Sequence, residues 1–170
     1  MLRFLFRRLT DEPGRGRALF EQAVAEARRP HWYLAGEVPD TIDGRFAMLA
    51  TVCALIAVRL ERSGEASQLL SAALTERFIE AMDAEHREFG LNDPGLGRKV
   101  RKLVGALERR VDDWRSATEG KKDWDEAVVS SVYRGTLPSQ PALESSGTAL
   151  RDLWSRLSAA SDTQLPGGDF

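Results

Sequence analysis

The sequence has little of the material from which catalytic and metal sites are built. It contains one cysteine, Cys53, and two histidines, His31 and His86, among 170 residues. A single cysteine excludes an intramolecular disulfide and any metal site that needs several cysteines. Two histidines leave few side chains for a catalytic triad or a metal centre. The composition therefore predicts a protein that is not an enzyme, with no catalytic residue, no metal or other cofactor and no small-molecule substrate.

The sequence also lacks a hydrophobic run long enough to cross a bilayer and a strong excess of either charge. Its longest apolar run, residues 46–58, is interrupted only by Thr51 and is followed by Arg59. A spanning helix needs about 20 apolar residues, so this run predicts a buried helix of a soluble domain. The 24 basic and 26 acidic residues give a formal net charge of −2. Bulk charge therefore does not favour a nucleic-acid-binding protein.

An amphipathic segment opens the chain. Within residues 1–12 the apolar side chains recur at the spacing of one helix face, and arginines lie between them. Such a segment is typical of a helix that lies on an anionic membrane surface, although the same pattern suits a terminus that packs on the body of the protein. The predicted membrane-contact residues are Leu2, Leu5, Phe6 and Leu9.

Helical periodicity dominates the rest of the chain, and no segment shows the alternation typical of a strand. We expect an all-α, single-domain bundle of about five to six helices within residues 13–157. The last residues, 158–170, are mostly small or polar and include Pro166-Gly167-Gly168. That composition predicts a disordered tail.

A long apolar helix over residues 41–63 forms the expected centre of the bundle. One stripe of apolar residues steps along it by three and four, and a second apolar face lies beside the first. A helix that is apolar most of the way round is contacted from several sides. The stripe consists of Ile42, Phe46, Leu49, Cys53, Ile56 and Leu60, and the second face of Met48, Val52 and Leu55.

The entry to this helix carries the first of two charged clusters. Asp40 and Asp43 stand where the helix dipole and the free N–H groups favour anions. Arg45 lies directly before an apolar core residue, Phe46. A charged side chain in such a place needs a partner. The helix start therefore explains the two aspartates but leaves Arg45 as a candidate functional residue.

The second charged cluster lies near the end of the next predicted helix. Its candidate residues are Asp83, Arg87, Glu88 and Asp93. We expect contacts between the two clusters where three helices meet, with Asp83 or Asp93 as partner of Arg45. A solvated charged face remains the alternative, because most surface ion pairs contribute little to stability.

A basic side follows on the helix predicted over residues 95–118. Two interpretations stay open for it: a solvated helix flank, or a patch for RNA or anionic lipid. The basic-patch residues are Arg98, Lys99, Arg101, Lys102 and Arg109.

Together, these motifs and their spacing resemble the ubiquinol–cytochrome c reductase (respiratory complex III) assembly chaperone family. Residues 39–46 look like that family's entry to its central helix, and residues 59–60 resemble the end of that helix. Residues 82–93 resemble a second signature of the family. Residues 100–114 are similar to its third segment, and residues 28–33 to its lead-in.

The resemblance implies an all-α assembly chaperone that binds newly made cytochrome b at the cytoplasmic face of the membrane. Such a protein needs a client-binding surface, for which the resemblance points to the two charged clusters. Mitochondrial members work with a small partner protein near the ribosomal exit, so the ribosome, an anionic membrane surface and a small partner protein are further expected partners. The sequence has no long organellar presequence, which favours a bacterial member in the cytoplasm or peripheral on the inner membrane. The alternative function is a helical RNA- or ribosome-binding or scaffold module that uses the basic face of helix 95–118.

Overall fold

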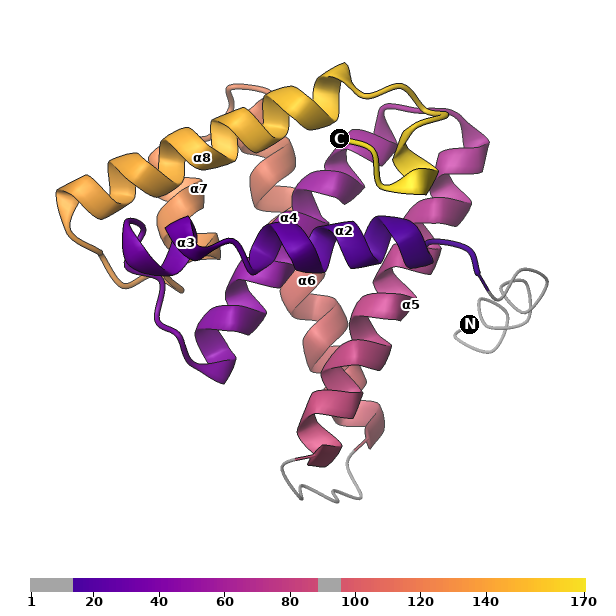
Figure 1. The fold of residues 1–170 in the computed structure, drawn as a ribbon, viewed down its shortest axis with the longest axis horizontal. Coiled ribbons are helices and arrows are strands. Elements are labelled where there is room, and N and C mark those ends of the chain that lie inside the picture. The colour runs from indigo at the N-terminus through magenta and orange to yellow at the C-terminus, as the bar shows by residue number, and fades with distance from the viewer. Residues whose placement is uncertain (1–13, 89–95) are drawn as a thin grey trace.

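One long helix, α4 (Ile42–Glu61), forms the centre of the molecule, and the other helices are arranged around it (Figure 1). The computed structural model describes residues 14–88 and 96–170, and no strand occurs in these two stretches. The all-α, single-domain bundle predicted from the sequence is confirmed. The other elements are α2 (Arg17–Ala27), α3 (Pro30–Leu34), α5 (Glu65–Glu88), α6 (Leu96–Thr118), α7 (Trp124–Ser131), α8 (Gln140–Ala159) and the 3₁₀ turn η1 (Leu165–Gly167).

Helix α4 is buried along almost its whole length, as its two apolar faces predict. The Thr41 hydroxyl caps its first turn by accepting a hydrogen bond of 3.1 Å from the Gly44 N–H. From Ala47 to Val58 every residue is buried, because α2, α5, α6, α7 and α8 all pack against this helix. Burial on all sides is what a helix without a polar face requires.

The one polar residue in the apolar run of α4 joins a buried hydrogen-bond network. Thr51 donates to the Ala47 carbonyl at 2.7 Å, and its hydroxyl lies 2.7 Å from that of Ser131 on α7. The indole N–H of Trp114 on α6 donates to the Ser131 hydroxyl at 3.0 Å. Because each buried polar group has a partner, Thr51 is accommodated in the core. The network also ties α4 to α6 and α7.

Helices α5 and α6 are the longest elements, and they project together beyond the rest of the molecule, at the bottom of Figure 1. They contact each other as well as α4. In none of the helices of residues 14–88 and 96–170 do length and apolarity combine as a membrane crossing requires. The predicted membrane-contact residues Leu2, Leu5, Phe6 and Leu9 lie outside the described residues, so that contact stays a prediction.

The prediction that residues 158–170 form a disordered tail is wrong. This segment folds back over α2, where Leu165 is fully buried. Arg59 at the end of α4 holds the start of the segment, donating to the carbonyls of Leu157 at 3.0 Å and Ala160 at 2.7 Å. The composition of the tail gave no sign of this, because the arginine that orders it lies about a hundred residues earlier in the chain.

Candidate functional site

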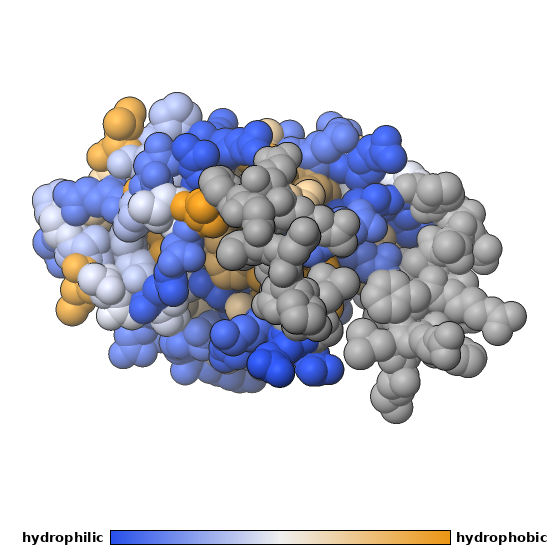
Figure 2. All heavy atoms as spheres, turned by 90° about the horizontal axis from the view of Figure 1, so that it is seen from below, coloured by the Kyte–Doolittle hydropathy of each residue, from blue (hydrophilic) through white to orange (hydrophobic). Residues whose placement is uncertain are grey.

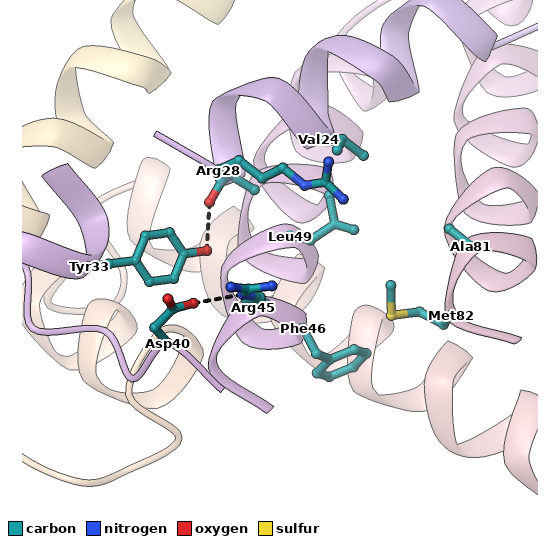
Figure 3. Close-up of a pocket in the computed structure, with 10 residues that line it drawn as sticks. Val24, Arg28, Tyr33, Asp40, Arg45, Phe46, Leu49, Ala81 and Met82 are labelled. Atoms are coloured by element: carbon teal, nitrogen blue, oxygen red, sulfur yellow. Dashed lines mark hydrogen bonds and ion pairs between the residues drawn. The ribbon is translucent and has the colours of Figure 1, made fainter. Parts of the chain in front are cut away.

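A groove of about 510 Å³ opens where α2, α3, α4 and α5 meet, and it brings together residues of the sequence motifs (Figure 3). Its floor is apolar and comes from three helices. Its rim is polar and comes from the end of α2, from α3 and from the entry to α4. The floor residues are Val24, Ala27, Phe46, Leu49, Ala81 and Met82, and the rim residues are Arg28, Tyr33, Asp40 and Arg45.

The floor depends on Phe46, the aromatic residue of the first charged cluster. In Figure 3 its ring points from α4 toward Met82 on α5. The ring also packs against Phe78 of α5, with 5.7 Å between the ring centroids. Phe46 is only partly buried, so part of an aromatic ring stays available at the groove surface. An accessible aromatic ring beside apolar neighbours is a good anchor point for another polypeptide.

On the rim, Arg45 pairs with Asp40 rather than with a buried acid. Their N–O distance is 2.7 Å, and the two side chains are 64% and 61% exposed. The hydrogen bond from Arg45 lowers the pKa of the Asp40 carboxyl. An exposed pair of this kind contributes little to stability, so both charges are available to a binding partner at small cost.

Tyr33 closes one side of the rim. Its hydroxyl donates to the Ala27 carbonyl at 2.8 Å, which holds the short helix α3 against the end of α2 (Figure 3). Burial raises the pKa of the Tyr33 phenol. Arg28 extends its guanidinium over the groove beside Leu49, and no described acidic side chain forms an ion pair with it.

Gly44 allows the connector before α4 to pass close to the first turn of the helix, and this close approach arranges the charges of the first cluster around the helix start. A Cβ atom at position 44 would run into the carbonyl oxygen of Pro39, so only glycine lets the connector cross the first turn of α4 this closely. Asp43 then turns to the other side of the helix, where it pairs with Arg134 at 2.7 Å. The two aspartates of the motif therefore serve two different surfaces.

A second arginine stands behind Phe46. The guanidinium of Arg110 on α6 lies 5.7 Å from the centre of the Phe46 ring. It donates to the carbonyls of Ser131 at 3.0 Å and Ala106 at 3.0 Å. Burial lowers the pKa of Arg110 to about 10. The segment 100–114 contains both Arg109 and Arg110, and the structure places Arg110 against Phe46 and leaves Arg109 exposed.

The groove lining includes Met82, the sequence neighbour of the second charged cluster, and no described residue of that cluster itself. Met82, directly before Asp83, forms with Ala81 the part of the floor that α5 supplies. Arg87 and Glu88 belong to the last turn of α5, and Asp93 lies outside the described residues. The predicted pairing of Arg45 with Asp83 or Asp93 therefore stays a prediction.

The basic-patch residues lie together on the first half of α6, away from the groove lining. Arg98, Arg101, Lys102 and Arg109 are exposed, and Lys99 belongs to the same turns of the helix. Seen from below, the molecule shows a mainly hydrophilic surface around smaller hydrophobic patches (Figure 2).

The side chains that most often serve as nucleophiles or metal ligands are scarce around the groove. Among the groove residues that the structure describes, none is a histidine or a cysteine. Cys53 is fully buried in α4, and burial raises the pKa of its thiol to about 12, which keeps it protonated and unreactive. In the described stretches, no three His, Cys, Asp or Glu side chains gather as a metal site would require.

The sequence did not single out four of the ten residues that line the groove, namely Val24, Ala27, Leu49 and Ala81. The helical spacing of Val24, Ala27 and Leu49 predicts only that they face the core. Periodicity shows that a helix face is covered, but it does not show whether a groove leaves part of that face accessible. Arg28 and Tyr33 entered only through the resemblance of residues 28–33. The available signal was Pro30, which ends the α2 pattern and stands between the arginine pair 28–29 and the aromatic residues Trp32 and Tyr33.

Comparisons with known proteins bear on the whole fold. A family model described as "Ubiquinol-cytochrome C chaperone" matches residues 35–170. The crystal structure of the Cbp3 homolog from Brucella abortus is similar over 100% of this chain and 95% of that chain, with a TM-score of 0.78 and 26% sequence identity. No curated protein matches the sequence. The family match includes Asp40, Arg45, Phe46 and Met82 of the groove, whereas Arg28 precedes it.

Proposed function

Since the chain belongs to the ubiquinol–cytochrome C chaperone family, we propose that it assists the assembly of respiratory complex III by binding newly made cytochrome b. The groove at the entry to α4 is the client-binding site. The protein acts without a catalytic step, in the bacterial cytoplasm at the face of the inner membrane where this client is inserted.

The single observation that carries this proposal is the composition of the groove. It combines an apolar floor, contributed by Phe46, Leu49 and Met82, with a rim of exposed charges. Apolar side chains of an unassembled membrane protein find a place on the floor, and polar groups of its backbone or loops find partners on the rim.

The proposal also explains why the motif residues are not fully used in folding. Asp40 and Arg45 form an exposed pair whose loss costs the fold little. Phe46 leaves part of its ring uncovered. A chaperone must release its client, and small contributions from a few anchors suit reversible binding.

Site-specific photo-crosslinking in cells tests the binding site. The photoreactive amino acid p-benzoylphenylalanine replaces Phe46 in one strain and Thr148 in a control strain. Thr148 is exposed on α8 and does not line the groove. We expect a light-dependent adduct with cytochrome b from position 46 and none from position 148. Equal adducts from both positions, or an adduct without cytochrome b from position 46, would overturn the groove as the site.

Removal of the gene tests the function separately. We expect the deletion strain to lose assembled complex III and its cytochrome b haem signal, and the wild-type gene to restore both. A Phe46→Ala variant should restore less complex III than wild type at equal protein level. An unchanged amount of complex III in the deletion strain would overturn the proposed function.

A further inference from the structure

A row of basic side chains on α6 forms no ion pair with an acidic side chain in the described part of the protein. We name it the α6 basic strip. Its four members are exposed, and none forms an ion pair with a described acidic residue. The strip consists of Arg98, Arg101, Lys102 and Arg109.

Basic residues in and just after the second half of α6 differ from the strip because they form ion pairs with described acidic residues. Arg115 binds Glu61 at 2.7 Å and Asp112 at 2.6 Å. Lys122, just beyond the helix, binds Asp113 at 2.6 Å. Cations near the end of α6 are thus neutralised within the fold, whereas those of the strip are left to an external partner.

The geometry of α6 makes the strip one continuous surface. At 3.6 residues per turn its members fall within an arc of about 100°, and they extend over roughly 16 Å of helix. The buried side chains Leu103, Leu107 and Trp114 occupy the opposite side of α6. Gly105 lies in the middle of the arc, so no side chain rises between the charges.

We propose that the α6 basic strip docks the protein onto an anionic lipid surface. A folded protein partner would require an apolar or aromatic anchor, and the strip has none among its exposed side chains. Single-stranded nucleic acid would require aromatic rings on which bases stack, and these are absent from the strip as well. A lipid headgroup layer requires only a row of accessible positive charges.

The position of the strip favours this docking although the whole chain has a net charge of −2. The strip lies on α6, which projects with α5 beyond the rest of the molecule (Figure 1), and acids of α5 such as Glu76 and Glu80 belong to the same pair of helices. Repulsion from those acids is screened within about 10 Å at 0.1 M salt. Glu108 is the exposed acid next to Arg109 and offsets one of the four charges.

Vesicle co-sedimentation of the full chain tests the proposal. Phosphatidylcholine vesicles with and without phosphatidylglycerol serve as probes. In the strip variant, all four strip residues are changed to Gln. A matched control removes the same number of exposed positive charges elsewhere and consists of Arg17→Gln, Lys121→Gln, Arg134→Gln and Arg151→Gln.

We expect the wild type to bind only the phosphatidylglycerol vesicles and to be released by salt. At about fivefold per cation, the strip variant should bind those vesicles more than about a hundredfold more weakly than the control variant. Equal far-ultraviolet circular dichroism spectra and equal melting temperatures of the two variants confirm that folding is not the cause.

Three results would overturn the proposal. The first is equal vesicle binding by the strip variant and the control variant. The second is loss of binding on deletion of residues 2–9 while the strip variant still binds, which would assign membrane contact to the N-terminal segment. The third is no wild-type vesicle binding together with strip-dependent binding of RNA. None of these measurements depends on cytochrome b, so they leave the proposed client site untouched.

Discussion

Each end of α4 carries an arginine, and the two arginines differ in exposure and in the groups that they bind. Arg59, at the C-terminal end, is 12% exposed and donates to two backbone carbonyls, to Ser63 and to Asp162. Arg45, at the N-terminal end, is 64% exposed and pairs with the exposed Asp40. A guanidinium that satisfies buried carbonyls is part of the fold, whereas one on an open rim is available for binding.

The contrast extends to the surroundings of each end. The C-terminal end of α4 is covered by residues 158–170, which Arg59 fastens in place. The N-terminal end borders the groove, where no segment of the described chain covers Phe46 completely. Stability is therefore concentrated at one end of the central helix and binding capacity at the other.

The largest expected effect comes from removing the structural arginine. Arg59→Ala leaves the carbonyls of Leu157 and Ala160 without their donor and detaches the C-terminal segment. We expect the free energy of unfolding to fall by about 2–4 kcal/mol, since hydrogen bonds to charged groups and their unsatisfied partners are costly to lose. Urea denaturation measures this change. A loss below about 0.5 kcal/mol, the level of an ordinary surface substitution, would remove the distinction between the two ends.

A smaller loss of stability is expected from a substitution in the middle of α4. Thr51→Val keeps the shape of the side chain but removes its hydroxyl from the buried network with Ser131 and Trp114. The Ser131 hydroxyl then loses one partner, and we expect a cost of about 1–3 kcal/mol. Thermal and urea unfolding measure it, with Thr75→Val as control, because Thr75 makes a local bond to Ser71 and is only partly buried. Equal losses in both variants would contradict a role for the network.

Acid should weaken the fold at both ends of α4 through one aspartate each. Hydrogen bonds from Ser63 and Arg59 lower the pKa of Asp162, and the bond from Arg45 lowers that of Asp40. A carboxyl with a depressed folded-state pKa stabilises the fold above its unfolded value of about 3.9 and loses that contribution as pH falls through the folded pKa. We therefore expect Asp162→Asn and Asp40→Asn to reduce the loss of stability as the pH falls below about 4. Unfolding by urea at stepped pH tests this, and unchanged pH profiles in both variants would contradict it.

The smallest effect on stability is expected at the groove. Arg45→Ala removes a side chain that is 64% exposed and breaks its exposed ion pair with Asp40, so the free energy of unfolding should stay within about 0.5 kcal/mol of wild type. The cost of about 3–5 kcal/mol that applies to a buried pair does not arise here. Crosslinking of cytochrome b from position 46 should nevertheless decrease in this variant. A large loss of stability with unchanged crosslinking would show that Arg45 serves the fold and not client binding.

The sequence predicted the helices well because their apolar stripes are long. It located the central helix over residues 41–63, where the structure has α4 at Ile42–Glu61 with Thr41 as its cap. The start of α7 is equally local, because the Asp123 carboxylate accepts from the N–H groups of Asp125 and Glu126. These features depend on neighbours within a few residues, and such local rules are visible in a single sequence.

The sequence could not predict features that depend on distant residues. The order of residues 158–170 comes from Arg59, and the groove comes from the angle at which α2 and α5 approach α4. The same limit explains the assignment of Arg45: its place beside Phe46 indicates a buried charge, but the first turn of α4 turns it outward to Asp40. A side chain's exposure is a property of the packed helices and not of its immediate neighbours in the sequence.

The burial of Cys53 makes its thiol a probe of transient opening of the protein core. Its thiol has no exposed surface and, with a pKa of about 12, almost no thiolate at neutral pH. A thiol reagent can therefore react only when the packing around α4 opens, so its rate of reaction reports how often that opening occurs. Because the sequence has one cysteine, the rate at which the unmodified protein reacts with a thiol reagent measures how often its core opens.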